Sequence, residues 1–511
     1  MVRPTPARAK LPSIAGLLVL ATVMLSACGS AGPPPAGAVI AARSSGSGAA
    51  GRAPGAVLAA TPVLTDWPQF GLDPQRRGSS DHVTGITAAN VAHLRRTTVA
   101  LPGTVDSSPI YLHAVRVGGA AHDVIVATTS YGRTVAVDAR SAKILWTFAA
   151  APSRSLVGTS QITNASPVAA GLWVWSASPD GHVHKLALAD GHEATGWPVA
   201  VTRAPRTEKI TSSLNLDGRY LVVTTGGYFG DAPPYQGHVM LLDRNSGRVV
   251  SFFASLCGNR RRLFAPATCA ASESAIWSRS GAVIEPGGHR LLVATGNGPY
   301  DGRANLGDSV IELTVPGLAV RQVYTPRNQA QLSSQDADLG SSSPALLGSH
   351  LTVIAGKDGV MRLLRLDRLD GRPPGGRRAT GGEIQTLPTP GGAELFTAPA
   401  VWQRGGRTLV LVSDSQGTGA YGLGGGRLRA LWHNASAGTS PVVAGGLLFV
   451  YDPNRGGVRV YTAASGHPLA VLPCGPGHWN SPIVANGQLV VPEGDANAHS
   501  ARGTLNIFST R

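Results

Sequence analysis

Four cysteines in the sequence limit the thiol chemistry that the chain can do. Cys257 and Cys269 lie twelve residues apart in one Arg-rich segment, which predicts a disulfide if the chain folds in an oxidising compartment. Cys474 is left without a partner or an assigned role, and Cys28 belongs to the leader described below. No Cys-x-x-Cys-His motif occurs, which excludes a covalently attached c-type haem.

Carboxylates are the second group with possible chemistry. Glycoside hydrolysis needs two carboxylates that flank a cleft. Glu273, Glu285 and Glu312 are the acids that we considered, and their positions in the sequence indicate no pairing. A polysaccharide-binding or hydrolytic protein therefore remains an alternative to the two hypotheses given at the end of this subsection, without a residue pair to support it.

One glycine-rich stretch matches a nucleotide-binding pattern by its letters. Residues 417–422 read Gly-Thr-Gly-Ala-Tyr-Gly and follow an apolar run, as in the first turn of a dinucleotide-binding unit. Such a unit continues into a helix, whereas this sequence continues with Leu423 and three further glycines. We therefore predict a hairpin loop at this position.

The elements that position these residues begin with an export signal at 1–27. Basic residues are followed by an apolar run at 11–25, which is too short for a membrane-spanning helix. The end of this segment, Leu-Ser-Ala-Cys, resembles the lipobox of bacterial lipoproteins. The resemblance implies that Cys28 carries a diacylglycerol thioether and anchors the protein to the cell membrane outside the cytoplasm. The alternative is an ordinary secretory signal that is cut nearby.

Residues 28–62 consist mainly of Ala, Gly, Ser and Pro, which predicts a flexible tether before a globular part at 63–511. Lys and Arg together number 44 against 29 acidic residues, so the formal net charge is +15. Because the arginines are scattered rather than gathered with aromatic residues, we expect no nucleic-acid partner. Anionic lipid or wall polymer suits this charge better.

The globular part reads as a series of β-rich repeats. Charged residues make up only 14% of the chain, and its 65 glycines and 37 prolines favour an all-β protein with many turns. A small-residue pair repeatedly precedes a β-branched run and a Gly turn. The pairs are Ser108-Pro109, Ser166-Pro167, Ser343-Pro344, Ala398-Pro399, Ser440-Pro441 and Ser481-Pro482, with looser forms at Ser212-Ser213 and Ile276-Trp277. Units of roughly 40 to 65 residues have the size of propeller blades.

Two further motifs carry a family resemblance. Residues 136–146 resemble the tryptophan-docking motif of quinoprotein propellers, and 66–71 resemble the segment that opens the same fold. The copies at 241–251 and 460–470 lack the tryptophan, so we expect docking between most blades to rest on aliphatic residues. The resemblance implies one all-β propeller of seven or eight four-stranded blades. The strand at 94–101 has no blade of its own and is expected to close the ring against the last unit.

The resemblance also implies a cofactor site on the propeller axis. Quinoprotein dehydrogenases hold pyrroloquinoline quinone stacked on a tryptophan, beside Ca²⁺ and a catalytic aspartate. By position in the motifs, Trp277 matches the stacking platform and Asn297 matches a calcium ligand. Asp338 falls where the family carries its catalytic base, and Lys357 falls where a basic residue contacts the quinone oxygens. The same residues also suit ordinary core and turn positions.

The implied set of calcium ligands is incomplete. The family's glutamate has no counterpart within 226–231, where only Asp231 can substitute for it. The adjacent-cysteine disulfide of many alcohol-oxidising members is also missing. The leading hypothesis is therefore a membrane-anchored extracytoplasmic propeller that acts as a binding or scaffold protein, with protein partners at the cell envelope. The alternative is a dehydrogenase that depends on pyrroloquinoline quinone and Ca²⁺.

Overall fold

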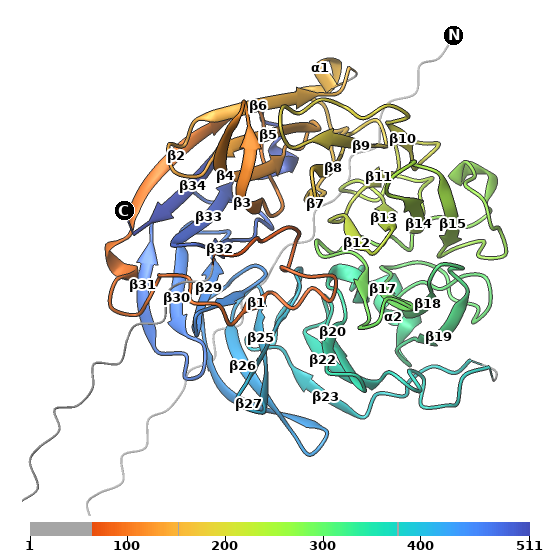
Figure 1. Ribbon diagram of the computed structural model, residues 1–511. Coiled ribbons are helices and arrows are strands. Elements are labelled where there is room, and N and C mark those ends of the chain that lie inside the picture. The colour runs from red at the N-terminus through yellow and green to blue at the C-terminus, as the bar shows by residue number, and fades with distance from the viewer. Residues whose placement is uncertain (1–63, 152, 376–377, 511) are drawn as a thin grey trace, which may run out of the picture. The chain divides into compact units, whose positions relative to one another are not determined.

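The computed structural model of the chain describes residues 64–151, 153–375 and 378–510. The signal at 1–27, Cys28 and the tether lie outside the described residues. Eight antiparallel sheets stand around one axis, as Figure 1 shows, which confirms the all-β propeller and sets its blade count at eight. In the described part of the chain, no helix is long and apolar enough to cross a membrane.

Blades one to four follow one another in the chain, each from its inner to its outer strand. Blade one holds β3 (Ile110–Val117), β4 (Ala120–Thr128), β5 (Arg133–Asp138) and β6 (Ile144–Ala149). Blade two holds β7 (Val168–Ala170), β8 (Trp173–Ala177), β9 (His182–Ala187) and β10 (Val199–Ala200). Blade three holds β12 (Asn215–Asp217), β13 (Tyr220–Gly226), β14 (His238–Asp243) and β15 (Val249–Ala254), with β11 (Lys209–Ile210) added beside β13. Blade four holds β16 (Val283–Ile284), β17 (Arg290–Ala294), β18 (Val310–Thr314) and β19 (Val320–Tyr324).

Blades five to eight complete the ring. Blade five holds β20 (Ala345–Leu347), β21 (Leu351–Ile354), β22 (Val360–Arg365) and β23 (Gln385–Pro388). Blade six holds β24 (Ala400–Arg404), β25 (Arg407–Ser413), β26 (Thr418–Gly424) and β27 (Arg427–Asn434). Blade seven holds β28 (Val442–Ala444), β29 (Leu447–Tyr451), β30 (Val458–Thr462) and β31 (Pro468–Leu472), with β1 (Ser79–Ser80) beside β28. Blade eight holds β32 (Ile483–Ala485), β33 (Gln488–Glu493), β34 (Gly503–Ser509) and β2 (Arg95–Leu101).

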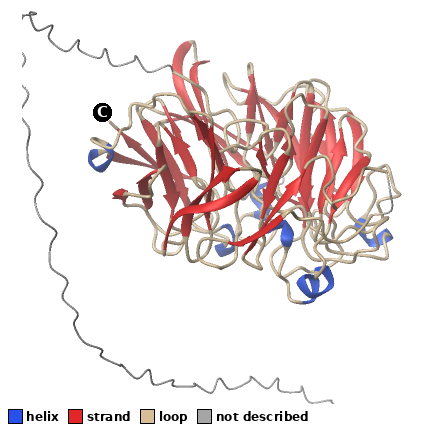
Figure 2. Cartoon of the chain, turned by 90° about the horizontal axis from the view of Figure 1, so that it is seen from below, coloured by secondary structure: helices blue, strands red, loops and turns tan. Residues whose placement is uncertain are grey.

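Helices are few and short in the described residues, and they lie in the connections between strands (Figure 2). The two α-helices are α1 (Ser153–Leu156) and α2 (Gln329–Ser334). The motif at 417–422 lies at the β25–β26 turn and in β26, which confirms the hairpin expected there. The apolar core lies between the blades, because consecutive strand residues point to opposite faces of a sheet. Leu291 packs against blade three and Leu292 against blade five, which explains the continuous apolar run at this strand.

The small residues of the Ser-Pro pairs lie at the crowded start of each inner strand, where their hydroxyls bond to the next blade. Ser166 Oγ accepts a 2.9 Å hydrogen bond from the backbone N–H of Ser108, and Ser343 Oγ donates over 2.9 Å to Ser278 Oγ. Ser440 Oγ accepts from the N–H of Ala398 at 3.2 Å. The repeated pair is therefore a joint between blades as well as the start of a strand.

Two of the eight starts were placed wrongly in the sequence. The inner strands of blades three and four begin at Asn215 and Val283, so the equivalent pairs are Ser213-Leu214 and Gly281-Ala282. The loose pairs Ser212-Ser213 and Ile276-Trp277 lie earlier in the chain. The error arose because no proline marks these two starts.

Tryptophans dock three pairs of neighbouring blades. Trp146 donates to a carbonyl of blade two at 2.9 Å, and a Cβ added to Gly191 of that blade would lie 2.6 Å from its ring. Trp432 packs in the same way on Gly466 of blade seven. Trp197 packs less closely on Gly247 of blade three, with its ring 3.4 Å from an added Cβ, and its Nε1 has no hydrogen-bond partner among the described residues. The expectation of aliphatic docking is therefore wrong at these two further pairs. The copies at 241–251 and 460–470 supply only the glycine turn, because the preceding blade supplies the tryptophan.

The N-terminal strand closes the ring as expected. Strand β2 pairs with β34 in antiparallel register from Arg95 opposite Ser509 to Leu101 opposite Gly503. Blade eight therefore takes its outer strand from the start of the propeller and its other three strands from the end. This pairing leaves no open sheet edge between the first and last blades.

Residues 67–80, here called the axial plug, cross one end of the ring and contact six blades (Figure 1). Backbone groups of Trp67, Pro68, Pro74 and Gly78 bond to blades one, two, four and seven. Arg76 is 4% exposed and donates to the carbonyl oxygens of Phe70, Ser213 and Leu214. A void of only about 10 Å³ separates the plug from the Ser-Pro pairs, so the ring is filled at this end.

Candidate functional site

A cavity of about 420 Å³ opens among loops that connect blades and loops that join second to third strands; we call it the axial cavity. Its lining residues are Asn164, Lys209, Thr211, Gly227, Tyr228, Phe229, Gly230, Asp231, Ala275, Trp277, Arg279, Asn297, Asp336, Asp338, Lys357, Phe396, His478, Trp479 and Asn497. Cavities of this size accommodate small-molecule ligands.

All five residues that the sequence assigned to an axial site line this cavity: Asp231, Trp277, Asn297, Asp338 and Lys357. Asp231 and Asn297 come from the β13–β14 and β17–β18 loops, and Lys357 comes from the β21–β22 loop. Trp277 and Asp338 precede the inner strands of blades four and five. The structure thus brings the candidates together, while their catalytic and binding roles stay predictions.

Asp338 and Lys357 form a buried ion pair in the cavity wall. Asp338 is 3% exposed, and its Oδ2 lies 2.6 Å from Lys357 Nζ. Its Oδ1 accepts a 2.5 Å hydrogen bond from the backbone N–H of Asn297. Burial raises the pKa of Asp338 to about 6, and attraction to Lys357 opposes that rise. For Lys357, burial is outweighed by Asp338 and Asp336, so its pKa lies above the ordinary value and the ammonium persists at neutral pH.

The chain around this pair has no space for larger residues. A Cβ on Gly296 would lie 2.2 Å from Asp338 Oδ1, so only glycine fits at this position. Asp308 is buried close to Asp338 and accepts a 3.2 Å hydrogen bond from the backbone N–H of Leu339. Burial and then the Asp338 charge raise the pKa of Asp308 to about 8, so this carboxyl is protonated at neutral pH.

Aromatic rings gather on the same cavity. The Trp479 ring lies 5.2 Å from that of Trp277 and 5.1 Å from that of Phe396, the latter pair being stacked at 17°. His478 stacks on Trp479 at 3.9 Å. Our sequence reasoning missed Phe396 and Trp479, although both stand two residues before a small-residue–proline pair. That shared position is the signal that would have found them.

A second set of charges lies on another part of the cavity wall. Arg279 is 4% exposed, lies 3.2 Å from Asp106 and has its guanidinium carbon 4.7 Å from the centre of the Trp479 ring. His478 Nδ1 lies 2.7 Å from Asp106 Oδ2. Although burial alone raises it, His478 and Arg279 hold the pKa of Asp106 well below its ordinary value. Nothing in the sequence pattern predicted this group, because its members lie far apart in the chain.

Comparison with known proteins finds similar folds among solved structures but no curated protein of similar sequence. No protein-family model and no curated protein matches the chain. The quinohemoprotein alcohol dehydrogenase of Comamonas testosteroni matches with a TM-score of 0.64 at 16% identity, over 89% of this chain and 81% of that one. A europium-containing methanol dehydrogenase gives 0.62 at 14% identity, over 87% and 98%. BamB from Moraxella catarrhalis gives 0.50 at 14% identity, over 82% and 98%.

The chain has the quinoprotein propeller fold. At these identities the likeness covers the fold alone, so function has to be argued from the site. The neighbours themselves include both alcohol-oxidising enzymes and BamB, and they do not decide between the two hypotheses.

The aromatic rings and buried cations of the axial cavity suit a quinone cofactor. Pyrroloquinoline quinone is flat and carries several carboxylates, which suit aromatic faces and buried cations. Among the described residues, the Nε of Arg279 has no hydrogen-bond partner, although the side chain is buried. Arg76, Arg133 and Arg459 also have a buried Nε without a partner in the described part of the chain. Of these four arginines only Arg279 lines the axial cavity, where an anionic ligand would satisfy this donor.

Calcium does not fit the same residues as they lie here. The ion takes six to eight oxygen ligands. Asp231 Oδ1 instead accepts a 2.6 Å hydrogen bond from the Tyr235 hydroxyl, and the Asn297 side chain faces Asp336 at 3.4 Å. Asp336 and Asp338 both bind the ammonium of Lys357. The ammonium of Lys357 therefore already pairs with the two carboxylates that a calcium ion would need as ligands.

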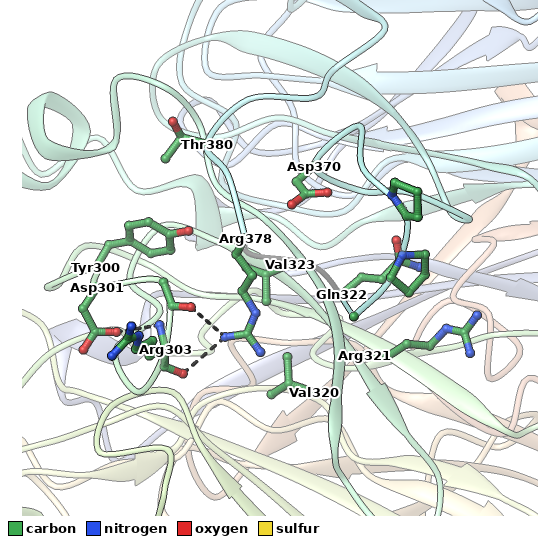
Figure 3. A pocket seen from close by; sticks show the side chains of 14 residues that line it. Tyr300, Asp301, Arg303, Val320, Arg321, Gln322, Val323, Asp370, Arg378 and Thr380 are labelled. Carbon is green, nitrogen blue, oxygen red and sulfur yellow. Dashed lines mark hydrogen bonds between the residues drawn. The ribbon is translucent and has the colours of Figure 1, made fainter.

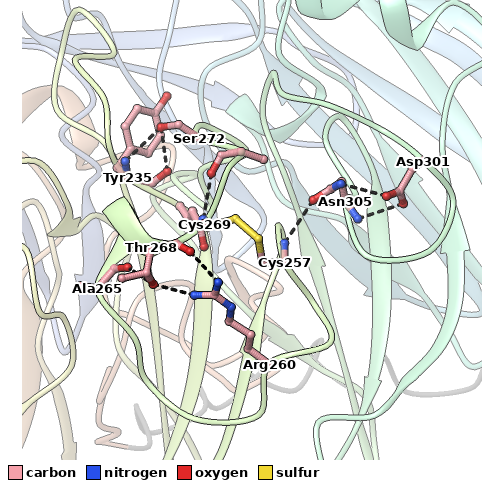
Figure 4. The surroundings of a disulfide bond; sticks show 11 residues. Tyr235, Cys257, Arg260, Ala265, Thr268, Cys269, Ser272, Asp301 and Asn305 are labelled. Atoms are coloured by element: carbon pink, nitrogen blue, oxygen red, sulfur yellow. Dashed lines mark hydrogen bonds between the residues drawn. A yellow bond between two sulfur atoms is a disulfide. The ribbon is translucent and has the colours of Figure 1, made fainter.

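The predicted disulfide is connected to a residue of the cavity through Ser272 and Tyr235, which Figure 4 shows beside it. Cys257 and Cys269 are bonded, which confirms the pairing. Close to Cys269, Ser272 exchanges hydrogen bonds with the backbone of Tyr235, whose hydroxyl holds Asp231. Cys474 is half-buried, and burial raises the pKa of its thiol to about 11.

A larger cavity of about 1170 Å³ lies at the outer edge of blades four and five (Figure 3). Arg303, Arg321 and Arg378 line it, with Asp301 and Asp370 as its acids. Arg378 donates to two backbone carbonyls of the β17–β18 loop. None of the residues that the sequence assigned to a site lies in this cavity.

Blade two holds a Ser-His-Glu array of the kind that activates a nucleophile. His184 Nε2 lies 2.8 Å from Ser178 Oγ, and His184 Nδ1 lies 2.5 Å from Glu193 Oε1. Ser178 is only 1% exposed, and its hydroxyl also bonds to Asp180. A substrate has no path to this hydroxyl, so the array stabilises the β8–β9 turn.

Proposed function

We propose that the protein is an extracytoplasmic propeller, anchored to the membrane through lipid on Cys28, that binds a flat anionic ligand in its axial cavity. The observation that carries the proposal is the buried Arg279, whose Nε lacks a partner beside the aromatic ring of Trp479. A scaffold role with protein partners at the cell envelope rests on the fold-level likeness to BamB alone.

Charge and aromatic surface act together in this proposal. Arg279 supplies a permanent positive charge to the cavity wall, near Lys209, whose ammonium donates to a neutral acceptor. Lys357, by contrast, is already paired with two aspartates. Trp277 and Trp479 offer faces on which a planar ring stacks. Pyrroloquinoline quinone is the ligand that best combines these properties with the fold.

The test is the thermal stability of the lipid-anchored protein in detergent with added pyrroloquinoline quinone. A ligand at a hundred times its Kd raises the free energy of unfolding by about 2.7 kcal/mol. We expect a clear rise that is largely lost in Trp277→Ala, while the control Trp173→Ala in blade two keeps it. Absence of any rise with the quinone and with benzenetricarboxylate would contradict the proposal.

The quinone- and calcium-dependent dehydrogenase remains a second candidate, because Trp277, Asn297, Asp338 and Lys357 share one cavity. In that role Asp338 is the general base, and its pKa of about 6 suits proton transfer near neutral pH. Bound quinone would supply the two-electron oxidation. Lys357 would hold the quinone oxygens, but the calcium that this role also requires from Asn297 does not fit the side chains as they lie here.

Calcium dependence separates the two candidates. The dehydrogenase requires quinone binding and alcohol-dependent dye reduction to rise with Ca²⁺ and to fall by at least about tenfold in Asn297→Ala, if one ligand contributes about 1.4 kcal/mol. If quinone affinity is equal in Ca²⁺ and in chelator, the dehydrogenase is excluded and the binding proposal stands.

A further inference from the structure

Lys209 differs from the other lysine of the axial cavity because it has no carboxylate partner in the described part of the chain. It belongs to β11, is 7% exposed and lines the cavity. Its Nζ donates to Asn164 Oδ1 at 2.7 Å, a neutral acceptor, and lies 5.1 Å from the centre of the Tyr228 ring. Lys357, by contrast, binds Asp336 and Asp338 directly.

The charges around Lys209 do not compensate its burial. Burial lowers the pKa of its amine most, and the Arg279 cation lowers it further. Asp106, Asp231 and Asp495 oppose this, but Asp106 is already paired with Arg279 and His478. The pKa of Lys209 falls to about 7, so neutral amine is plentiful at physiological pH.

The use of lysine in this chain supports a role for the amine itself. The sequence has 39 arginines and only five lysines, yet two of those five line the axial cavity. An arginine stays charged at any ordinary pH, whereas a buried lysine can lose its proton and act as a nucleophile. A residue needed only for its charge would more simply be the arginine that the chain otherwise prefers.

We propose that the Lys209 amine forms a Schiff base with the carbonyl group of a ligand bound in the axial cavity. This inference rests on the proposed function. The amine nitrogen adds to the carbonyl carbon, the carbonyl oxygen leaves as water after taking up two protons, and a C=N bond forms. The step needs no oxidant or reductant, and water reverses it.

The neighbours of Lys209 define the class of ligand. The unpartnered Nε of Arg279 suits a carboxylate, and the Trp479 ring beside it suits a flat apolar group. The ligand class is therefore an aromatic 2-oxo acid or another planar carboxylate with a reactive carbonyl. Because the Arg279 charge acts on the Lys209 amine, a carboxylate on Arg279 would place the adjacent carbonyl on the side of Lys209.

Reductive trapping tests the proposal. The protein is incubated at pH 7 with phenylpyruvate and cyanoborohydride, which converts the imine to a stable amine, and the modified lysine is located by peptide mass spectrometry. A pKa near 7 gives Lys209 a neutral fraction more than about a thousandfold above that of Lys357, whose pKa is raised. We expect labelling of Lys209 to exceed that of Lys357 by at least about tenfold, even if access is unequal.

Matched measurements separate this proposal from the one on which it rests. Phenyllactate, which has no carbonyl, is titrated calorimetrically into the wild type and into Lys209→Arg, whose fold is checked by its thermal transition. Binding of phenyllactate to both, with trapping of phenylpyruvate on Lys209 alone, supports the Schiff base. Binding without an adduct, or an adduct on Lys357 instead, overturns it and leaves the ligand-binding function intact. Absence of binding by either acid overturns the Schiff base, while the ligand-binding function is decided separately by the thermal-stability measurements with the quinone and benzenetricarboxylate.

Discussion

Glu285 and Glu312 are buried side by side in blade four, although their positions in the sequence indicated no pairing. Arg290 joins them, at 3.0 Å from Glu285 and 3.3 Å from Glu312. Burial and then the charge of Glu312 raise the pKa of Glu285 to about 7. The pair is part of the blade core, and among the described residues no cleft separates its carboxyls in the way that glycoside hydrolysis needs.

The stability of the protein is therefore expected to depend on the protonation of Glu285. The folded state binds this proton more tightly than the unfolded chain, whose carboxyl has the ordinary pKa of 4.5. Its contribution is fully present below pH 4.5 and is lost as pH rises through about 7. We predict that Glu285→Gln removes roughly 2–3 kcal/mol of this pH-dependent loss of unfolding free energy. Denaturant unfolding at pH 5 and pH 8 measures it, with the exposed Glu394→Gln as a variant that keeps the wild-type difference.

Single residues of the axial cavity were predictable where a local motif marks them. Trp277, Asn297 and Asp338 each stand in a motif with a known place in the fold, and all three reach the cavity. Lys209 and Arg279 carry no such mark. The charge state of Lys209 depends on its burial and on the nearby Asp106, which also pairs with Arg279. Asp106 comes close to both residues because the propeller fold brings blade one near them, which the spacing in the sequence does not indicate.

At the scale of elements, the docking of one blade on the next gives a sharp test. Gly191 and Gly196 of blade two both have positive φ, at +75° and +85°, but only Gly191 faces the Trp146 ring. We predict that Gly191→Ala lowers the free energy of unfolding by about 1–3 kcal/mol more than Gly196→Ala. The control carries only the backbone cost of about 1–2 kcal/mol. Equal losses in denaturant titrations would show that Trp146 packing contributes little.

Strand starts were recovered from the sequence where proline marks them and misplaced where it does not. Ser166-Pro167 and Ser481-Pro482 precede β7 and β32 directly, whereas blades three and four begin later than expected. Tryptophan docking was underestimated for a different reason. The ring and the glycine that receives it lie in different repeats, so a motif read within one repeat misses Trp197 and Trp432.

At the scale of the whole molecule, Arg76 ties the axial plug to blade three, one of the six blades that the plug contacts. Its guanidinium satisfies three buried carbonyls in the plug and blade three, and burial lowers its pKa to about 9. We predict that Arg76→Met lowers the free energy of unfolding by about 2–5 kcal/mol, since unpaired buried carbonyls cost roughly 1–3 kcal/mol each. Arg77→Met, which removes a surface pair with Asp73, costs less than about 1 kcal/mol. Similar values for the two in denaturant unfolding would refute this role of the plug.

The blade number and the closing strand were predictable because repetition and one strand without a blade are visible in the sequence. The axial plug was not, since 67–80 contains no repeat and only the two-residue strand β1. Five of the blades that it contacts are reached by backbone hydrogen bonds, and these blades are distant in the chain. Such contacts leave no residue pattern behind.

The pairing of Arg95–Leu101 with Gly503–Ser509 determines when the nascent chain can complete its fold. Synthesis delivers the chain from its N-terminus, so β2 emerges early and its partner β34 emerges among the last residues. Until then β2 presents unpaired backbone groups that invite aggregation, and no local contact can replace the missing strand. The unpaired edge of β2 in such a nascent chain must be kept from aggregating until synthesis is almost complete, and the ring closes only when the final strand has been made.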